Sequence, residues 1–231
     1  MSFQDELKTE LKNQGADLVH FVDISKLSSE QNKGYPSAIL IGVILSPNFI
    51  RKITDTPDCN QELIPNNRIE KNEFQIKESE TDNLADFAAS YFKSKGYSAY
   101  SQSEDNIYST GFYNVKTKST PLPHKTIAGL AGLGWIGKNN LIVSTEFGSA
   151  ISMCSILTDA PIKTVLHPPI NSRCGNCSIC KDICKVKAIK GNSWEFGISR
   201  NKLVDVFKCN MCLKCLVLCP WTQKYMSENI R

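Results

Sequence analysis

The sequence of 231 residues predicts an α+β fold, in which a mixed helix and strand domain precedes a small cysteine-rich module. Two observations predict this class. Helical and strand patterns alternate through the first part of the chain, and eight of the ten cysteines fall within 174–219. A chain of this length can bury one sizeable core plus a small appended module. We therefore place one domain at 1–165 and a second at 166–231, and the linker contains Pro161, Pro168 and Pro169.

The first third of the chain carries one helical pattern and two strand patterns. Apolar residues at every fourth position predict a helix over 3–14. Apolar runs bounded by turn residues predict strands at 18–22 and 38–45, and a proline ends the second run. Residues 51–80 are polar and contain an Asp-Cys-Asn and a Pro-Asn-Asn turn, which predict a long loop with at most a short helix.

The next stretch completes the first domain. Its apolar spacing predicts a core-facing helix over 80–95 and a short strand over 97–100. A short helix and a glycine-rich turn are predicted within 121–138. Strands at 141–143 and 150–157 close the region, so the order of elements is that of an α/β or α+β domain.

The composition is that of an ordinary globular chain, with 41% hydrophobic and 22% charged residues. No run approaches the roughly 18 apolar residues that a membrane span needs, so we expect no membrane partner. The start, Met1–Glu6, has no basic stretch followed by an apolar run, and we expect a cytoplasmic location. In a reducing compartment, clustered cysteines indicate a metal site more than disulfides.

The cysteines of the second domain form a repeated motif with the spacing x2, x2, x3. The two copies are Cys174, Cys177, Cys180 and Cys184, then Cys209, Cys212, Cys215 and Cys219. Three closely spaced cysteines can wrap one face of a [4Fe–4S] cube, and the fourth binds the other cube in two-cluster ferredoxins. Zinc sites usually pair Cys-x2-Cys units across a long gap, so zinc is the weaker alternative.

Crossed ligation assigns the eight cysteines to two clusters. The first cluster takes Cys174, Cys177, Cys180 and Cys219. The second takes Cys184, Cys209, Cys212 and Cys215. We therefore predict a ferredoxin-like electron-transfer module that moves single electrons.

The formal net charge of +4 counts every cysteine as a neutral thiol. Eight thiolates would add about −8, and two oxidised cluster cores about +2 each. The loaded chain is then close to neutral. We expect no general nucleic-acid surface and no nucleic-acid partner.

The sequence between about residues 120 and 222 resembles the epoxyqueuosine reductase family, to which the reductive dehalogenases are related in architecture. The segments that carry this resemblance are Pro121–Lys125, Gly132–Leu141, Phe147–Ser149, Thr158–Ile162 and Cys215–Thr222. The resemblance implies that the first domain is nitroreductase-like and lacks the usual flavin. It also implies a base-off cobalamin between the domains, which the two clusters would reduce.

Five residues of the glycine-rich turn are implied as cofactor contacts. They are Gly132, Gly134, Trp135, Gly137 and Lys138. Glycine lets the backbone approach a large flat ligand, and Lys138 and Asn139 could meet its amide side chains.

The candidate catalytic residues are Tyr113, Lys118 and His124. The family carries an acidic proton donor three positions before the proline that matches Pro121, and this chain has Lys118 there. A tyrosine with a lysine, or His124 at the cofactor mouth, could donate the proton instead. The sequence has no counterpart of the helical-repeat domain with which the tRNA-modifying members grip RNA, so we expect a different substrate.

Three functions remain open: an oxidoreductase with a corrinoid, a protein that reduces and reactivates the corrinoid of another protein, and an electron carrier with no substrate. In each case we expect a low-potential donor such as ferredoxin or flavodoxin. Other polar residues have ordinary explanations. Cys59 is expected in a loop, Cys154 and His20 in buried strands, and His167 in the linker.

Overall fold

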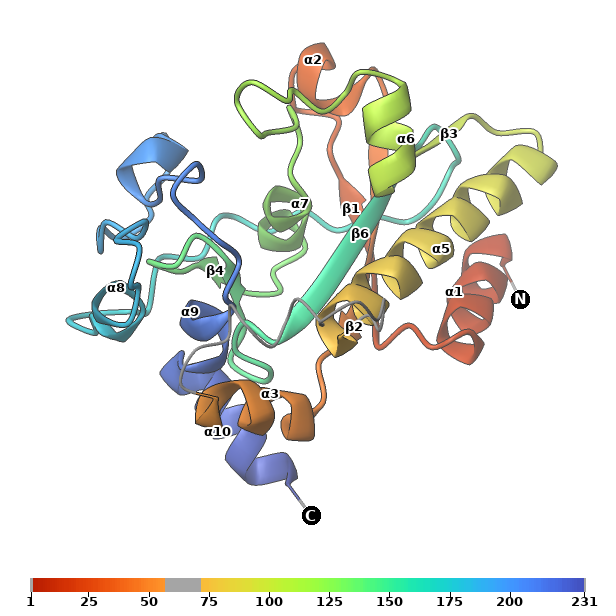
Figure 1. Cartoon of the computed structure of the whole chain (residues 1–231). Helices are drawn as coiled ribbons and strands as arrows, with labels where there is room; N and C mark the ends of the chain where they lie inside the picture. Colours follow the sequence, from red (N-terminus) through yellow and green to blue (C-terminus); the bar gives the residue numbers. More distant parts are fainter. Residues whose placement is uncertain (1, 57–71, 231) are drawn as a thin grey trace. The chain divides into compact units, whose positions relative to one another are not determined.

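The computed structural model describes residues 2–56 and 72–230 of the chain (Figure 1). These residues form two compact units that alternate along the sequence. The sheet unit contains Met1–Val43, Ile76–Gly132 and Ser152–Pro168. The cysteine unit contains Ile44–Gln75, Leu133–Ile151 and Pro169–Arg231.

The division differs from the two consecutive domains that the sequence pattern suggests. The chain passes from the sheet unit to the cysteine unit for the last time after Pro168, which is close to the predicted boundary at 165. However, Ile44–Gln75 and Leu133–Ile151 were assigned to the first domain and pack within the cysteine unit. The reason is a shared apolar cluster. Its buried members are Leu45, Phe49, Ile50, Ile53, Ala150, Leu216, Val217 and Tyr225.

The sheet unit is built on four strands in the order β1-β2-β6-β3. Their bounds are β1 Leu18–Asp23, β2 Ser37–Ile44, β3 Ala99–Ser101 and β6 Ile151–Thr158. β1 and β2 are antiparallel, as are β3 and β6. These strands confirm the predicted runs within one or two residues. The predicted linker is partly ordered, because Val165 pairs in parallel with Val22 of β1.

Helices α1 (Phe3–Asn13) and α5 (Glu73–Ser94) share an apolar core with this sheet. α1 is the predicted helix, and a capping box of Ser2 and Asp5 starts it. α5 begins well before the predicted residue 80, so the loop predicted at 51–80 is largely wrong where the structure describes it. Both predicted turns lie within 57–71, outside the described residues.

Three shorter helices complete the sheet unit: α2 (Ser29–Asn32), α6 (Glu104–Ser109) and α7 (His124–Leu130). α7 packs near β1 and is the short helix predicted after Pro121. The patterns did not predict α2 and α6, because helices of four and six residues show too little periodicity.

The cysteine unit contains small elements around the cysteine motifs. They are α3 (Pro47–Asp55), β4 (Trp135–Ile136), β5 (Ile142–Val143), α8 (Ile179–Asp182), the 3₁₀ turn η1 (Arg200–Lys202), α9 (Lys214–Val217) and α10 (Pro220–Asn229). α3 packs against α9 and α10, and β4 pairs with β5 as a hairpin. The sequence analysis missed α3, because Pro47 was interpreted only as the end of a strand.

Pro47 in fact opens α3, with Ser46 as its N-cap. The Phe49 N–H donates to Ser46 Oγ at 3.1 Å. Proline is favoured at the first helical position, where its missing N–H costs nothing. Pro220 starts α10 in the same way, directly after Cys219. No helix in the described part of the chain is long and apolar enough to cross a membrane.

Candidate metal centre and predicted site residues

One cavity of the cysteine unit gathers four of the eight motif cysteines. It measures about 170 Å³ and is lined by cysteines of both motifs. They are Cys174, Cys177, Cys180 and Cys219. Three come from the first motif and the last from the second, which is the set predicted for the first cluster. The fold therefore brings together thiols that lie up to 45 residues apart in sequence.

The electrostatic surroundings of Cys180 and Cys215 show the same grouping. Burial, then the nearby Cys174, Cys177 and Cys219 thiols, raises the pKa of Cys180 to about 11. Burial, then the nearby thiols, raises the pKa of Cys215 to about 12; these thiols are the three others of the second predicted set and Cys180 of the first. That set is completed by Cys184, Cys209 and Cys212.

The donor set fits an iron–sulfur cluster better than a single ion. Among the described residues, no three His, Cys, Asp or Glu side chains are close enough together to hold one metal ion. In a cubane, each thiolate binds a different iron corner, so the sulfurs stand apart. An apolar group of Ala188, Ile189 and Val204 packs against Cys180, Cys184 and Cys215 and keeps this region dry.

Lys138, predicted as a cofactor contact, holds the first cysteine loop. Its Nζ donates to the carbonyl oxygen of Gly175 at 2.7 Å and to that of Cys177 at 3.0 Å. The ammonium also lines the four-cysteine cavity. A charged donor makes stronger hydrogen bonds than a neutral one. Lys138 therefore fixes the loop that carries two of the predicted ligands.

Asn139, the next residue, holds the second cysteine motif. Its Nδ2 donates to the carbonyl oxygen of Cys215 at 3.1 Å and to Ser149 Oγ at 3.3 Å. Its Oδ1 accepts from the Leu141 N–H at 3.2 Å. The family resemblance places it, with Lys138, among the residues that could meet the amide side chains of a corrinoid. The adjacent Lys138 and Asn139 thus join both cysteine motifs to the β4–β5 hairpin.

The glycines of the predicted cofactor turn are packed against the chain itself. A Cβ on Gly134 would lie 2.1 Å from the carbonyl oxygen of Val143. A Cβ on Gly137 would lie 2.6 Å from Asn139 Oδ1. Both glycines are therefore required by the tight hairpin, and their contact with a cofactor stays a prediction. Gly132 lies in the sheet unit with φ +74°, and a Cβ there would meet the His167 ring at 2.8 Å.

Trp135 is buried behind the four-cysteine cavity, with 2% of its surface exposed. Its ring meets that of Trp221 edge to face at a centroid distance of 5.2 Å. The guanidinium of Arg173 lies 5.6 Å from the Trp135 ring centroid, and both Arg173 and Trp221 line the cavity. Among the described residues, the Trp135 Nε1–H has no hydrogen-bond acceptor, so this donor is available to a bound group.

Two further segments of the family resemblance meet in the cysteine unit. The Ser149 N–H donates to the buried Thr222 Oγ1 at 2.9 Å. A Cβ on Gly148, which has φ +58°, would lie 2.2 Å from the Thr222 nitrogen. The Phe-Gly-Ser and Cys-Pro-Trp-Thr motifs are thus two halves of one contact beside Cys219.

His124, a candidate proton donor, forms a polar chain inside the sheet unit. Its Nδ1 lies 2.8 Å from the Oγ of buried Ser155, which accepts from Gln102 Nε2 at 2.5 Å. Burial lowers the pKa of His124 to about 4, so the ring is neutral near pH 7. The Ser155 hydroxyl accepts from the Gln102 amide, and its hydrogen bond with Nδ1 can run in either direction, according to which ring nitrogen carries the histidine proton. Ser155 and Gln102 were not predicted, because isolated polar residues give no sequence signal.

Tyr113 and Lys118, the other catalytic candidates, have contacts of their own. The ring of Tyr113 lies against that of Tyr108, with centroids 4.6 Å apart. Burial and the Tyr113 hydroxyl raise the pKa of Tyr108. Lys118 is exposed, with φ +50°, in a turn closed by pairing of Asn114 with Ser119. His124 contacts Ser155 instead, and a shared catalytic role for the three stays a prediction.

The remaining polar residues match their ordinary explanations where they are described. Cys154 is fully buried. Burial is the main cause that raises the pKa of its thiol well above the usual value, and the nearby Asp82 carboxylate is the second cause. Burial lowers the pKa of His20 in β1. His167 is more than linker, because its ring covers Gly132. Cys59 lies outside the described residues.

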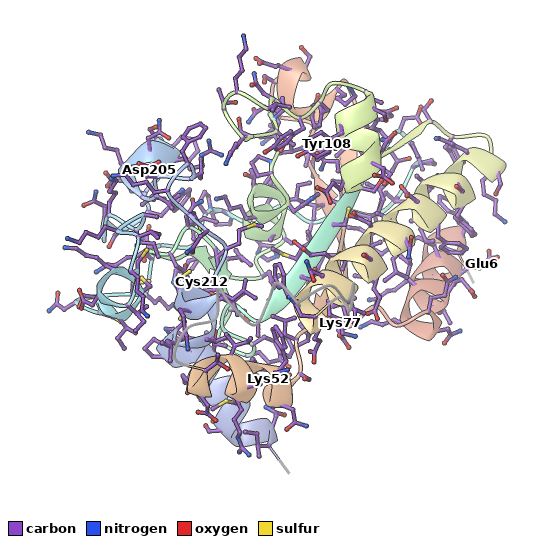
Figure 2. The ribbon with its side chains drawn as sticks, in the orientation of Figure 1. Glu6, Lys52, Lys77, Tyr108, Asp205 and Cys212 are labelled. Carbon is purple, nitrogen blue, oxygen red and sulfur yellow. The ribbon has the colours of Figure 1, made fainter. Side chains whose placement is uncertain are left out.

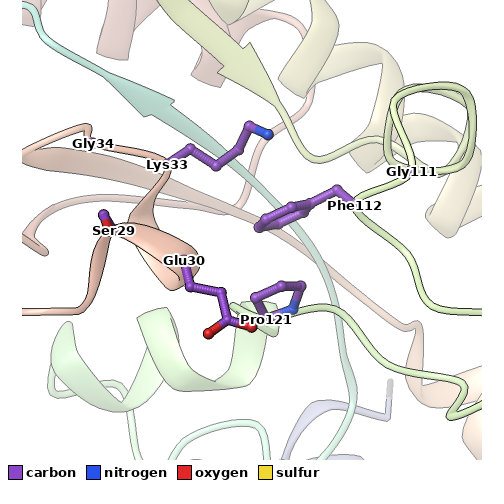
Figure 3. Close-up of a pocket in the computed structure, with 7 residues that line it drawn as sticks. All are labelled: Ser29, Glu30, Lys33, Gly34, Gly111, Phe112 and Pro121. Carbon is purple, nitrogen blue, oxygen red and sulfur yellow. The ribbon is translucent and has the colours of Figure 1, made fainter.

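An open hollow in the sheet unit was not predicted (Figure 3). It measures about 540 Å³, and Glu30, Lys33, Phe112 and Pro121 are among the residues around it. The Lys33 ammonium lies 4.6 Å from the ring centroid of Tyr100 and 4.8 Å from that of Phe112. These cation–π contacts direct Lys33 over the aromatic wall of the hollow.

Taken together, an α+β chain with two grouped sets of cysteine thiols defines the class of iron–sulfur electron-transfer proteins. No family model matches the chain. It is 30% identical over 127 residues to an epoxyqueuosine reductase of Pseudomonas aeruginosa, covering 46% of this chain and 33% of that protein. It is 43% identical over 130 residues to one of a Synechococcus species, covering 48% and 39%.

Solved structures share the fold of this chain. A crystal structure of epoxyqueuosine reductase with a tRNA-Tyr stem loop matches with a TM-score of 0.55 and 17% identity, over 96% of this chain and 65% of that one. A reductive dehalogenase described with a mechanism for B12-dependent dehalogenation matches with a TM-score of 0.61 and 19% identity, over 94% and 31%. At these identities the structures show the fold alone.

These findings confirm the predicted resemblance to epoxyqueuosine reductases and the predicted fold class. The matches span well under half of the length of the curated relatives named above. The likeness supports an iron–sulfur redox function.

Proposed function

We propose that the chain is an iron–sulfur oxidoreductase that passes single electrons through two [4Fe–4S] clusters to an acceptor. The observation that carries this proposal is the four-cysteine cavity, which joins three thiols of the first motif to Cys219 of the second. The grouping of Cys215 with the other four-cysteine set supports a second cluster. When bound, such clusters accept and release one electron at a time.

The residues of the cysteine unit prepare this site in three ways. The two motifs supply the thiolates, which metal binding deprotonates despite their raised pKa values. Lys138 and Asn139 fix the loops through backbone carbonyls. The apolar side chains beside Cys180 and Cys215 exclude water, which tunes the reduction potential.

Three serine variants test the assignment. Protein purified without oxygen should contain about eight irons and eight sulfides per chain. Cys219→Ser should lower both counts to about four by removing the first cluster, and Cys184→Ser should do the same for the second. The control Cys154→Ser, at a buried cysteine outside both sets, should keep about eight. A loaded protein with zinc instead of iron would refute the proposal.

As the acceptor, we propose a corrinoid. The support is the fold shared with a reductive dehalogenase described with B12-dependent dehalogenation. Three of the residues predicted to touch a corrinoid make contacts within the cysteine unit instead. Gly134 and Gly137 pack against the backbone and side chains of the hairpin, and Lys138 donates a hydrogen bond to the first cysteine loop. These three residues do not fit a ligand-facing role, whereas the Trp135 Nε1–H, buried without an acceptor among the described residues, remains available to a bound group.

Cobalt EPR decides between the open functions. Protein that holds cob(II)alamin base-off removes the splitting by the axial nitrogen that free base-on cob(II)alamin shows. This result would support a corrinoid enzyme or a corrinoid-reactivating protein, which turnover of small organic substrates then separates. If the spectrum is unchanged, the remaining functions are an electron carrier and an oxidoreductase that uses another acceptor.

A further inference from the structure

The positive charge of this chain is concentrated in one segment. Lys and Arg outnumber Asp and Glu by 27 to 23 in the whole chain and by six to two within 185–211, so the rest is balanced at 21 of each. The whole formal excess of +4 therefore lies between the fourth cysteine of the first motif and the second cysteine of the second.

Most of this segment folds as a hairpin-like insert, which places its cations close together. Ile189 pairs with Val204 in antiparallel orientation, and the Lys190 N–H donates to the Leu203 carbonyl oxygen at 2.8 Å. Asn192 Nδ2 donates to the Lys202 carbonyl oxygen at 2.7 Å. Lys190 and Lys202 are exposed on this insert.

The insert leads directly into an exposed iron-ligand candidate. Every residue from 207 to 211 is exposed, and Cys209 stands at the centre of this run. Two large apolar side chains flank it: Phe207 is 62% exposed and Met211 is 74% exposed. Asp205 and Cys212, both labelled in Figure 2, stand two residues before and one residue after this run.

Three properties thus coincide on the cysteine unit: surplus positive charge, exposed apolar side chains and a cysteine of the second predicted cluster at the surface. Exposed large apolar groups with a polar rim are typical of protein interaction sites. Clustered charge of one sign speeds the approach of a partner with the opposite sign. An exposed ligand brings the cluster within a short distance of that partner. A nucleic acid would use the charge but not the exposed cysteine.

We propose that residues 185–211, here called the basic patch, are the docking surface for an acidic ferredoxin-type electron donor. This inference rests on the proposed function. One electron leaves the reduced iron–sulfur centre of the donor, which is oxidised, and enters the cluster of Cys184, Cys209, Cys212 and Cys215, which is reduced. No bond forms or breaks. The cluster that includes Cys219 would then receive the electron from this first acceptor cluster.

The test compares two triple variants of the loaded protein with the wild type. The patch variant carries Lys190→Glu, Lys202→Glu and Lys208→Glu. The control variant carries Lys8→Glu, Lys93→Glu and Lys116→Glu, which are exposed lysines of the sheet unit and change the net charge equally. Stopped-flow mixing with a reduced plant-type [2Fe–2S] ferredoxin measures the rate of cluster reduction. Equilibrium binding of the oxidised proteins is measured at the same salt concentrations.

The patch variant should be reduced at least tenfold more slowly at low salt, and the difference should disappear near 1 M salt, because charge steering is screened. Binding should weaken in parallel. The control variant should behave as the wild type. Dithionite, which reduces through a small anion, should reduce all three proteins at the same rate near 1 M salt, where charge is screened. Phe207→Ser should weaken binding several-fold without changing its salt dependence.

Equal rates and affinities for the patch variant and the wild type would overturn the docking proposal, as would an equal loss in the control variant. Binding of an RNA stem loop by the patch, with no ferredoxin binding, would also overturn it. Protein purified without oxygen that holds no iron and sulfide would instead refute the proposed function.

Discussion

Replacing Lys138 by methionine should loosen one cluster and spare the other. The side chain keeps its length but loses two charge-assisted hydrogen bonds, of 2.7 Å and 3.0 Å, to the first cysteine loop. Hydrogen bonds to charged groups contribute about 1.5–3 kcal/mol each. Lys138 is half-buried, so the lower value applies to both bonds, which gives about 3 kcal/mol.

This loss predicts how fast iron escapes. If the loop opens before iron leaves, about 3 kcal/mol corresponds to an increase of about 100-fold in the release rate. Iron release into a ferrous chelator should therefore become biphasic in Lys138→Met. About four irons per chain should leave quickly, and the other four at the wild-type rate.

Two further variants make the assay specific. Lys138→Arg keeps the charge and should restore most of the slow release. Lys181→Met, at an exposed lysine of the same motif, should release iron as the wild type does. A single phase at the wild-type rate in Lys138→Met, or equal acceleration of all the irons, would refute the reasoning.

Three other changes have definite expected results. Gly148→Ala forces a Cβ to 2.2 Å from the Thr222 nitrogen at φ +58°, so it should lower the yield of folded, iron-loaded protein sharply; a normal yield would contradict the geometry. The pKa of His124 is lowered to about 4 against 6.5 in an unfolded chain, so folding stability should fall as pH drops from 7 to 5, by about 1–2 kcal/mol. Urea unfolding of His124→Gln should lack that part of the pH dependence. Desolvation of the carboxyl group by its neighbours, then the charges of two nearby carboxylates, raises the pKa of Glu78 to about 7 from 4.5 although the residue as a whole is exposed, so its contribution to stability falls as pH rises from 4.5 to 7. Glu78→Gln should therefore be the more stable protein at pH 8, by less than about 1 kcal/mol because the side chain is exposed, and a less stable variant would contradict the assignment.

The sequence predicted those parts of the fold that short-range patterns determine. α1 follows from three apolar residues at one helical spacing, and β2 from one continuous apolar run. α3 could not be recognised from the same evidence, because Pro47 can end a strand or begin a helix. Which one occurs depends on the contact of Phe49 and Ile53 with Leu216, far along the chain.

For the candidate site as well, the sequence predicted some features and could not indicate others. Ligand spacing alone indicated the two cysteine sets, because a cubane constrains the local loop. The partners of Lys138 are two backbone carbonyls, and no pattern in the sequence identifies a carbonyl as a partner. The Ser155–Gln102 pair beside His124 depends on the register of β6 and on the end of β3, which local propensity does not specify.

The alternation of the two units along the chain determines when the cluster site can form during synthesis. The cysteine unit takes α3 from the early part of the chain, the β4–β5 hairpin from the middle and both motifs from the end. Leu45 and Phe49 acquire their partners Leu216 and Tyr225 only after these late residues have left the ribosome. A fragment of residues 166–231 would lack α3, the hairpin and both loop-holding residues, Lys138 and Asn139. Stable cluster insertion is therefore a late event that requires all three segments, and iron content reports on completed folding of the cysteine unit.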